Sequence, residues 1–161
     1  MGKRYTFRTY LCKMPPFIFD ETIVPYSIDV DQQHHLVIAK FWGVFDSNEL
    51  EDELAEMDRM GPFDNHYRLL NVFAELMQYA ASTDVLRNTA RERTGLKWPE
   101  KRPFHPRTKR VIVAPSDTIF GLARLYDAEA YNDELTVVRT ITEAAAELGM
   151  DVADIDMTFP V

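Results

Sequence analysis

Two short, mainly apolar runs constrain the fold of this chain more than any other feature of its sequence: LLNVFA at 69–74 and VIVA at 111–114. Neither run alternates apolar with polar residues, and each is shorter than a buried helix, which is typical of a strand covered on both faces. A helical pattern follows each run, so the chain must cross over a face of the sheet before the next strand forms. We therefore expect an α/β domain with a small mixed, mostly parallel sheet and helices.

The segments around these runs predict the remaining elements. Residues 26–31 alternate apolar and polar side chains, and with an apolar strand at 35–45 they predict an antiparallel hairpin. Alternation at 4–12 and an apolar run at 135–139 indicate two further strands. Each expected helix begins beside a side chain that can cap it. The expected helices span 46–60, 83–94, 117–131 and 140–149.

The acidic residues of helix 46–60 are interpreted as its solvent-facing side. They are Glu49, Glu51, Asp52, Glu53, Glu56 and Asp58. Leu50, Leu54 and Met57 recur at helical spacing and predict the buried side.

The composition is that of an ordinary soluble globular protein, and we expect a cytoplasmic location. Cys12 is the only cysteine among 161 residues, so no disulfide can form within the chain and a reducing compartment is expected. No window approaches the roughly 18 apolar residues of a membrane span. The sequence has no glycine-rich phosphate motif, and its four histidines lack the spacing of metal ligands. We expect no cofactor and no bound metal.

One segment of this acidic chain is strongly basic. Residues 87–110 hold nine Lys or Arg and two Glu, a net charge of +7, whereas the remaining nine basic and 24 acidic residues give −15. Basic and aromatic side chains in its proline-rich part could bind an anionic ligand, or the segment docks on the protein's own acidic surface. The acidic remainder argues against binding of duplex nucleic acid. The candidate binding residues here are Lys97, Trp98, Lys101, Arg102 and Arg107.

The motif RVIVAPSDTIFGLARLY at 110–126, followed by LTVVRTITEAAAELG at 135–149, resembles the STAS and SpoIIAA-like (anti-sigma-factor antagonist) superfamily. It is most similar to an uncharacterised branch of that superfamily. The resemblance covers residues 26–149 and leaves 1–25 as an N-terminal extension and 150–161 as a C-terminal tail. It implies a non-catalytic binding or regulatory module that acts through protein–protein contacts.

The chain departs from the antagonists at their regulatory position. Their phosphorylatable Ser or Thr follows the central strand, where NVFAELMQ at 71–78 has no hydroxyl group. We therefore expect no kinase-controlled switch. The alternative function is binding of a small anionic or lipid-like molecule between the strand ends near Asn71 and the helix that begins at Ser116.

Ser116 and Asp117 are interpreted mainly as the start of helix 117–131. Serine is among the best N-cap residues, and an acidic side chain suits the first turn. A nucleophilic serine would need a base, and His105 is the only histidine near it in the sequence. We therefore assign no catalytic residue and expect no enzymatic activity.

The outer face of helix 117–131 is the expected contact surface. Gly121 and Ala128 lie opposite the predicted core stripe, where a solvated helix usually carries charged residues. Close approach of a second copy there would bury the flanking apolar side chains. We expect a homodimer through this face, and the expected contact surfaces for a further protein partner are this helix and the loop at 97–107. The candidate contact residues are Asp117, Phe120, Gly121, Arg124 and Leu125.

Overall fold

The computed structural model describes residues 5–6, 25–94, 103–105, 107–130 and 134–159. The strands are β1 (Tyr5–Thr6), β2 (Tyr26–Asp31), β3 (Leu36–Phe41), β4 (Val44–Phe45), β5 (Arg68–Phe73), β6 (Gln78–Tyr79), β7 (Arg110–Val113) and β8 (Leu135–Val138). The helices are α1 (Ser47–Met60), α2 (Thr83–Thr94), α3 (Asp117–Glu129) and α4 (Ile141–Leu148), followed by a 3₁₀ turn at Val152–Asp154.

The main sheet is mixed and mostly parallel, as predicted. Its six strands lie in the order β1-β2-β3-β5-β7-β8. The pairs β1–β2 and β2–β3 are antiparallel, whereas β3–β5, β5–β7 and β7–β8 are parallel. The hairpin at β2–β3 and the later parallel strands therefore confirm the α/β arrangement expected from the sequence.

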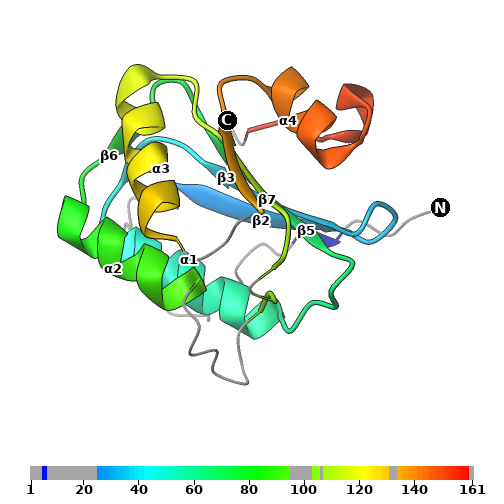
Figure 1. The fold of residues 1–161 in the computed structure, drawn as a ribbon, viewed down its shortest axis with the longest axis horizontal. Helices are drawn as coiled ribbons and strands as arrows, with labels where there is room; N and C mark the ends of the chain where they lie inside the picture. The colour runs from blue at the N-terminus through cyan, green and yellow to red at the C-terminus, as the bar shows by residue number, and fades with distance from the viewer. Residues whose placement is uncertain (1–4, 7–24, 95–102, 106, 131–133, 160–161) are drawn as a thin grey trace, which may run out of the picture.

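Helices cover both faces of this sheet (Figure 1). Side chains of α1 and α3 join one buried cluster, and those of α4 join another on the opposite face. Successive residues of a strand point to opposite faces, so Val37 and Ala39 of β3 belong to the first cluster and Leu36 and Ile38 to the second. Both faces of the central strands are thus buried, which is why their sequences are apolar runs.

Local capping groups begin the helices where the sequence predicts them. The Asp46 carboxylate accepts hydrogen bonds from the backbone N–H groups of Asn48 and Glu49, and Glu49 accepts one from the Asp46 backbone. Thr140 and Glu143 form the same reciprocal pair at the start of α4. Each cap satisfies backbone donors that the first helical turn leaves without partners.

The predicted strand at 35–45 is interrupted. Gly43 has φ 64°, a left-handed conformation that glycine adopts without strain and that breaks an extended strand. The residues beyond it form β4, which pairs with β6 in a separate two-stranded sheet. The expectation of one continuous strand was therefore wrong at its end.

The residues after α4 pack against the sheet. Ile155 is buried in the second cluster, with Met157 and Phe159 against it. Lys40 is also buried, and its Nζ lies 3.2 Å from the Asp29 carboxylate and donates a 3.0 Å hydrogen bond to the Thr158 carbonyl.

No helix among the described residues is long and apolar enough to cross a membrane.

Candidate ligand-binding cavity

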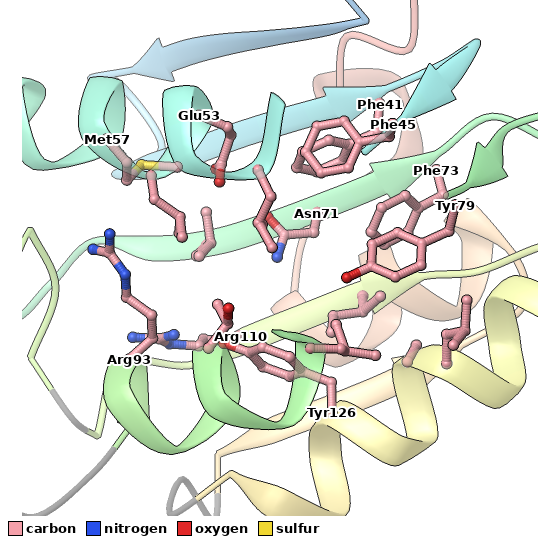
Figure 2. A pocket seen from close by; sticks show the side chains of 18 of the residues that line it. Phe41, Phe45, Glu53, Met57, Asn71, Phe73, Tyr79, Arg93, Arg110 and Tyr126 are labelled. Carbon is pink, nitrogen blue, oxygen red and sulfur yellow. The ribbon is translucent and has the colours of Figure 1, made fainter. Parts of the chain in front are cut away.

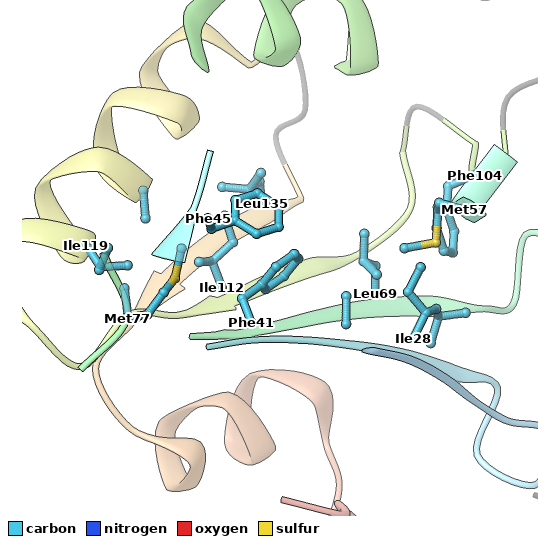
Figure 3. Close-up of a cluster of buried hydrophobic side chains, with 14 residues drawn as sticks. Ile28, Phe41, Phe45, Met57, Leu69, Met77, Phe104, Ile112, Ile119 and Leu135 are labelled. Atoms are coloured by element: carbon cyan, nitrogen blue, oxygen red, sulfur yellow. The ribbon is translucent and has the colours of Figure 1, made fainter. Parts of the chain in front are cut away.

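A cavity of about 130 Å³ lies between the sheet and helices α1, α2 and α3. Strands β3, β5 and β7 form its floor, and the loop at 103–104 closes part of its side. Most of its lining side chains are apolar, and several belong to the first buried cluster (Figure 3). The apolar lining residues include Phe41, Phe45, Leu50, Leu54, Met57, Leu69, Phe73, Met77, Ile112, Ile119, Leu122 and Ala123.

Strand alternation places two polar side chains on the cavity face of the sheet. In β5, Leu70 and Val72 face α4, so Asn71 between them faces the cavity. In β7 the same alternation turns Arg110 toward the cavity and Val111 away from it. These two polar residues are therefore fixed to a rigid sheet.

Glu53 contributes a third polar group, from α1. The sequence interpretation placed it on the solvent-facing side of this helix, and that is wrong: Glu53 is only 5% exposed and lines the cavity. Position 53 lies three residues after Leu50 and four before Met57, so helical geometry puts it in the middle of the buried stripe.

The environment of Glu53 favours its protonated form. The pKa of its carboxyl is raised from 4.5 to about 7: burial is the main cause, Glu56 and Asp58 add to the rise, and Arg93 and Arg110 oppose it. Among the described residues no side chain or backbone group makes a hydrogen bond to this carboxyl. Glu53 is thus a buried acid near its titration point at neutral pH.

Two arginines complete the charged end of the cavity. Arg93 of α2 is 15% exposed and donates a 2.6 Å hydrogen bond from Nη1 to Asp58 of α1. Arg110 is buried, and its guanidinium carbon lies 5.9 Å from the ring centre of Phe104. It also interacts with the Tyr126 hydroxyl, where burial raises the pKa and Arg110 opposes that rise.

The opposite end of the cavity is aromatic. Figure 2 shows Phe41, Phe45, Phe73 and Tyr79 at one end, the charged side chains at the other, and Asn71 between them. The Tyr79 hydroxyl points toward the middle of the cavity. This hydroxyl oxygen is buried and has no hydrogen-bond partner in the part of the chain that the structure describes, and burial raises the pKa of the hydroxyl. An unsatisfied buried hydroxyl is a group that a ligand could pair.

Of the predicted candidate residues that the structure describes, only Asn71 lines this cavity. Ser116 caps α3 by accepting a 3.3 Å hydrogen bond from the Ile119 backbone, as predicted. Asp117 is exposed and pairs with Arg139 at 2.9 Å. The structure thus supports the interpretation of Ser116 and Asp117 as the start of a helix.

The outer face of α3 is open at its centre and partly covered at its edges. Gly121 is exposed, and a side chain there would meet nothing within 4 Å. Phe120 packs partly against the core, with the Arg139 guanidinium 3.9 Å above its ring. Arg124 pairs with Asp127 of its own helix, and Leu125 is half-buried. Less apolar surface is therefore exposed on this face than the sequence suggested.

The described part of the basic segment is mostly paired with the protein's own acids. Arg87 and Arg91 of α2 both contact Glu129 of α3. Lys109 pairs with Glu147 at 3.1 Å. Arg107 is exposed, and the candidates Lys97, Trp98, Lys101 and Arg102 lie outside the described residues. Of these paired residues, only Lys109 lies in the proline-rich part for which the sequence left the two alternatives open.

Sequence reasoning missed the three charged side chains that line the cavity among the described residues, Glu53, Arg93 and Arg110, and also Tyr79. The two arginines were counted as members of an exposed basic stripe, although Arg110 directly precedes an apolar strand. For Glu53 the available signal was its place in the stripe with Leu50, Leu54 and Met57. Tyr79 follows no periodic pattern, and no sequence signal places it.

Comparisons with family models, with curated proteins and with solved structures return no match to this chain. The resemblance to STAS and SpoIIAA-like domains therefore stays a prediction from the sequence.

Proposed function

We propose that this protein binds a small, mainly apolar molecule in the cavity between the sheet and helices α1–α3. The observation that carries the proposal is the combination of volume and lining. An engineered protein cavity of about 150 Å³ lined by apolar side chains binds benzene. A cavity of about 130 Å³ with aromatic walls has the size for a single substituted ring.

The energetic cost of the cavity argues that it is more than a packing defect. Enclosed core cavities lower stability by about 24 cal/mol per Å³, so roughly 3 kcal/mol is the upper limit for this partly open cavity of 130 Å³. Domains of this size are stable by only about 5–15 kcal/mol. The unpartnered Tyr79 hydroxyl and the burial of the Glu53 carboxyl add a further cost because buried polar groups lose their water. A bound ligand would offset both the cost of the empty volume and the cost of the buried polar groups.

This function is the small-ligand alternative predicted from the sequence. The proposed site differs: the ligand binds in the cavity under α1–α3 and not beside Ser116. The function is compatible with the non-catalytic module that the resemblance to STAS-like domains implies, and with a cytoplasmic location. Asn71 is the predicted residue that this site retains. No step of catalysis is assigned to the lining residues.

Titration with benzene tests the proposal without knowledge of the natural ligand. Wild-type protein should bind benzene saturably, seen as NMR shifts of methyl groups around the cavity. Ala123→Leu adds bulk from a buried position in the lining and should abolish these shifts. Ala55→Leu makes the same change at an exposed position of α1 and is the matched control.

Absence of saturable binding by the wild-type protein would reject the proposed function. Equal binding by wild-type and a folded Ala123→Leu variant would reject this cavity as the site. If Ala123→Leu unfolds, the smaller change Ala123→Val provides the same comparison and should weaken benzene binding at least severalfold.

A second candidate function, self-association through the outer face of α3, has one supporting observation. Gly121 and Ala128 are both exposed, and the space above Gly121 is open. Light scattering of wild-type protein and of Gly121→Glu tests it: a dimer that the substitution converts to a folded monomer supports this interface, and a monomeric wild-type protein rejects it.

A further inference from the structure

We propose that the ligand carries a carboxylate, that this group binds between the guanidinium groups of Arg93 and Arg110, and that Glu53 takes up a proton as it binds. The inference rests on the proposed small-molecule binding and specifies the class of ligand. It assigns the apolar part of the ligand to the aromatic end of the cavity.

The charges of the lining favour an anion. Among the described residues, the charged lining side chains are Glu53, Arg93 and Arg110, and Asp58 pairs with Arg93 at 2.6 Å. These four groups sum to 0 when Glu53 is ionised and to +1 when it is protonated, so the site favours an anion once Glu53 holds a proton. The planar donors of guanidinium groups match the two oxygens of a carboxylate, and the bond is strongest where water is excluded.

The positions of these residues assign the carboxylate of the ligand and its apolar part to different ends of the cavity. The charged side chains gather at the end of the cavity near Met57, and Phe41, Phe73 and Tyr79 lie at the other end (Figure 2). The Arg93–Asp58 hydrogen bond uses Nη1, and a guanidinium has five N–H donors, so Arg93 can contact a second acceptor. An aromatic or branched aliphatic acid fits this division.

Glu53 is the group that responds to the incoming charge. Glu53 interacts electrostatically with charged or titratable groups on each neighbouring element, and these interactions shift its pKa or theirs. The groups are Arg93 of α2, Arg110 of β7, Tyr126 of α3, Tyr26 of β2, and Glu56 and Asp58 of α1. Its carboxyl is buried and has no hydrogen bond within the described structure. A second carboxylate beside it would leave two like charges in a water-poor site, which protonation of one relieves.

The proton comes from the solvent and forms an O–H bond on the Glu53 carboxyl, while the ligand stays ionised. Protonated Glu53 can then donate a hydrogen bond to a ligand carboxylate oxygen. Because the pKa of Glu53 is about 7 without ligand, this uptake costs little near neutral pH. Above that pH, each further pH unit makes the required protonation about tenfold less favourable.

Benzoate and benzamide form a matched pair of probes, because they have the same shape and differ in charge. At about pH 6 we expect benzoate to bind at least tenfold more tightly than benzamide. Its dissociation constant should rise about tenfold per pH unit above pH 7, while that of benzamide stays nearly constant. Calorimetry in phosphate and in Tris should report uptake of up to one proton per benzoate at about pH 8.

Substitutions assign these effects to residues. Glu53→Gln should remove both the pH dependence and the proton uptake, while Glu51→Gln, an exposed position of the same helix, should keep both. Arg93→Met should weaken benzoate more than tenfold and leave benzamide binding within about twofold.

The outcomes separate the two proposals. If benzene and benzamide bind but benzoate binds no more tightly than benzamide, the carboxylate inference is overturned and the proposed function stands. If benzoate binds without proton uptake, or if Glu53→Gln keeps the pH dependence, the role of Glu53 is overturned. If no probe binds at all, the proposed function itself fails.

Discussion

Replacement of Glu53 by Gln should change how the stability of the free protein depends on pH. Burial raises the pKa of Glu53 from 4.5 to about 7 in the folded protein. As the pH rises above about 4.5, the unfolded chain releases this proton while the folded protein still holds it, so stability falls until the pH passes about 7. Glutamine carries no titrating proton and lacks this dependence.

The size of the effect follows from the two pKa values. A tenfold change in an acid constant corresponds to about 1.4 kcal/mol, so the full loss is about 3 kcal/mol. Between about pH 5 and about pH 8, wild-type protein should lose roughly 2–3 kcal/mol more unfolding free energy than Glu53→Gln. Effects of the substitution that do not depend on pH, such as a change in packing, cancel when the unfolding free energies at the two pH values are subtracted.

Urea unfolding at the two pH values measures the difference directly. Glu51→Gln on the exposed side of α1 sets the baseline for removing one carboxyl from this acidic protein. If the unfolding free energies of Glu53→Gln and Glu51→Gln have the same pH dependence, Glu53 does not have a raised pKa. The assignment of a proton-binding acid to the cavity is then wrong.

Three other changes have definite expected results. Tyr79→Phe removes a buried hydroxyl that has no partner, and should raise the unfolding free energy by about 1 kcal/mol; a loss of stability would mean that this hydroxyl is satisfied. Gly121→Ala, at an exposed helical position with open space above it, should stabilise the monomer by about 0.5–1 kcal/mol in thermal unfolding. If that face is instead a close helix–helix contact, Gly121→Ala should weaken a dimer in sedimentation experiments. Arg110→Met should destabilise the protein more at about pH 8 than at about pH 5, because it removes a positive charge that opposes the raised pKa of Glu53; an equal loss at both pH values in urea would contradict the coupling.

The order of strands and helices could be predicted because it depends on local patterns. The runs at 69–74 and 111–114 are mainly apolar, and the strands begin and end within one residue of them. Helix starts depend on side chains within the first turn, so Asp46, Ser116 and Thr140 indicate them directly.

The interruption at Gly43 could not be derived from the apolar pattern. Residues 36–45 are apolar enough for one long strand, and glycine occurs within strands as well as at breaks. The deciding interaction is the pairing of β4 with β6, whose residues are more than 30 positions apart in the sequence.

The candidate site depended even more on contacts between distant elements. Charge alone suggested that Glu53 faces solvent, and for an isolated charged residue on a helix that assumption is usually sound. Its burial requires Arg93 from α2 and Arg110 from β7 nearby, and neither neighbour can be read from the sequence around position 53. Asn71 was predicted because the rule for open parallel sheets needs only the position of a strand end.

A crystal structure grown with 4-bromobenzoate at about pH 6 would show where the ligand binds, because the anomalous signal of bromine locates the ring. One bromine peak should lie inside the cavity, toward Phe41 and Phe73, with the carboxylate between Arg93 and Arg110. A cavity without a bromine peak, or a ring bound only on the surface, would contradict the proposed site.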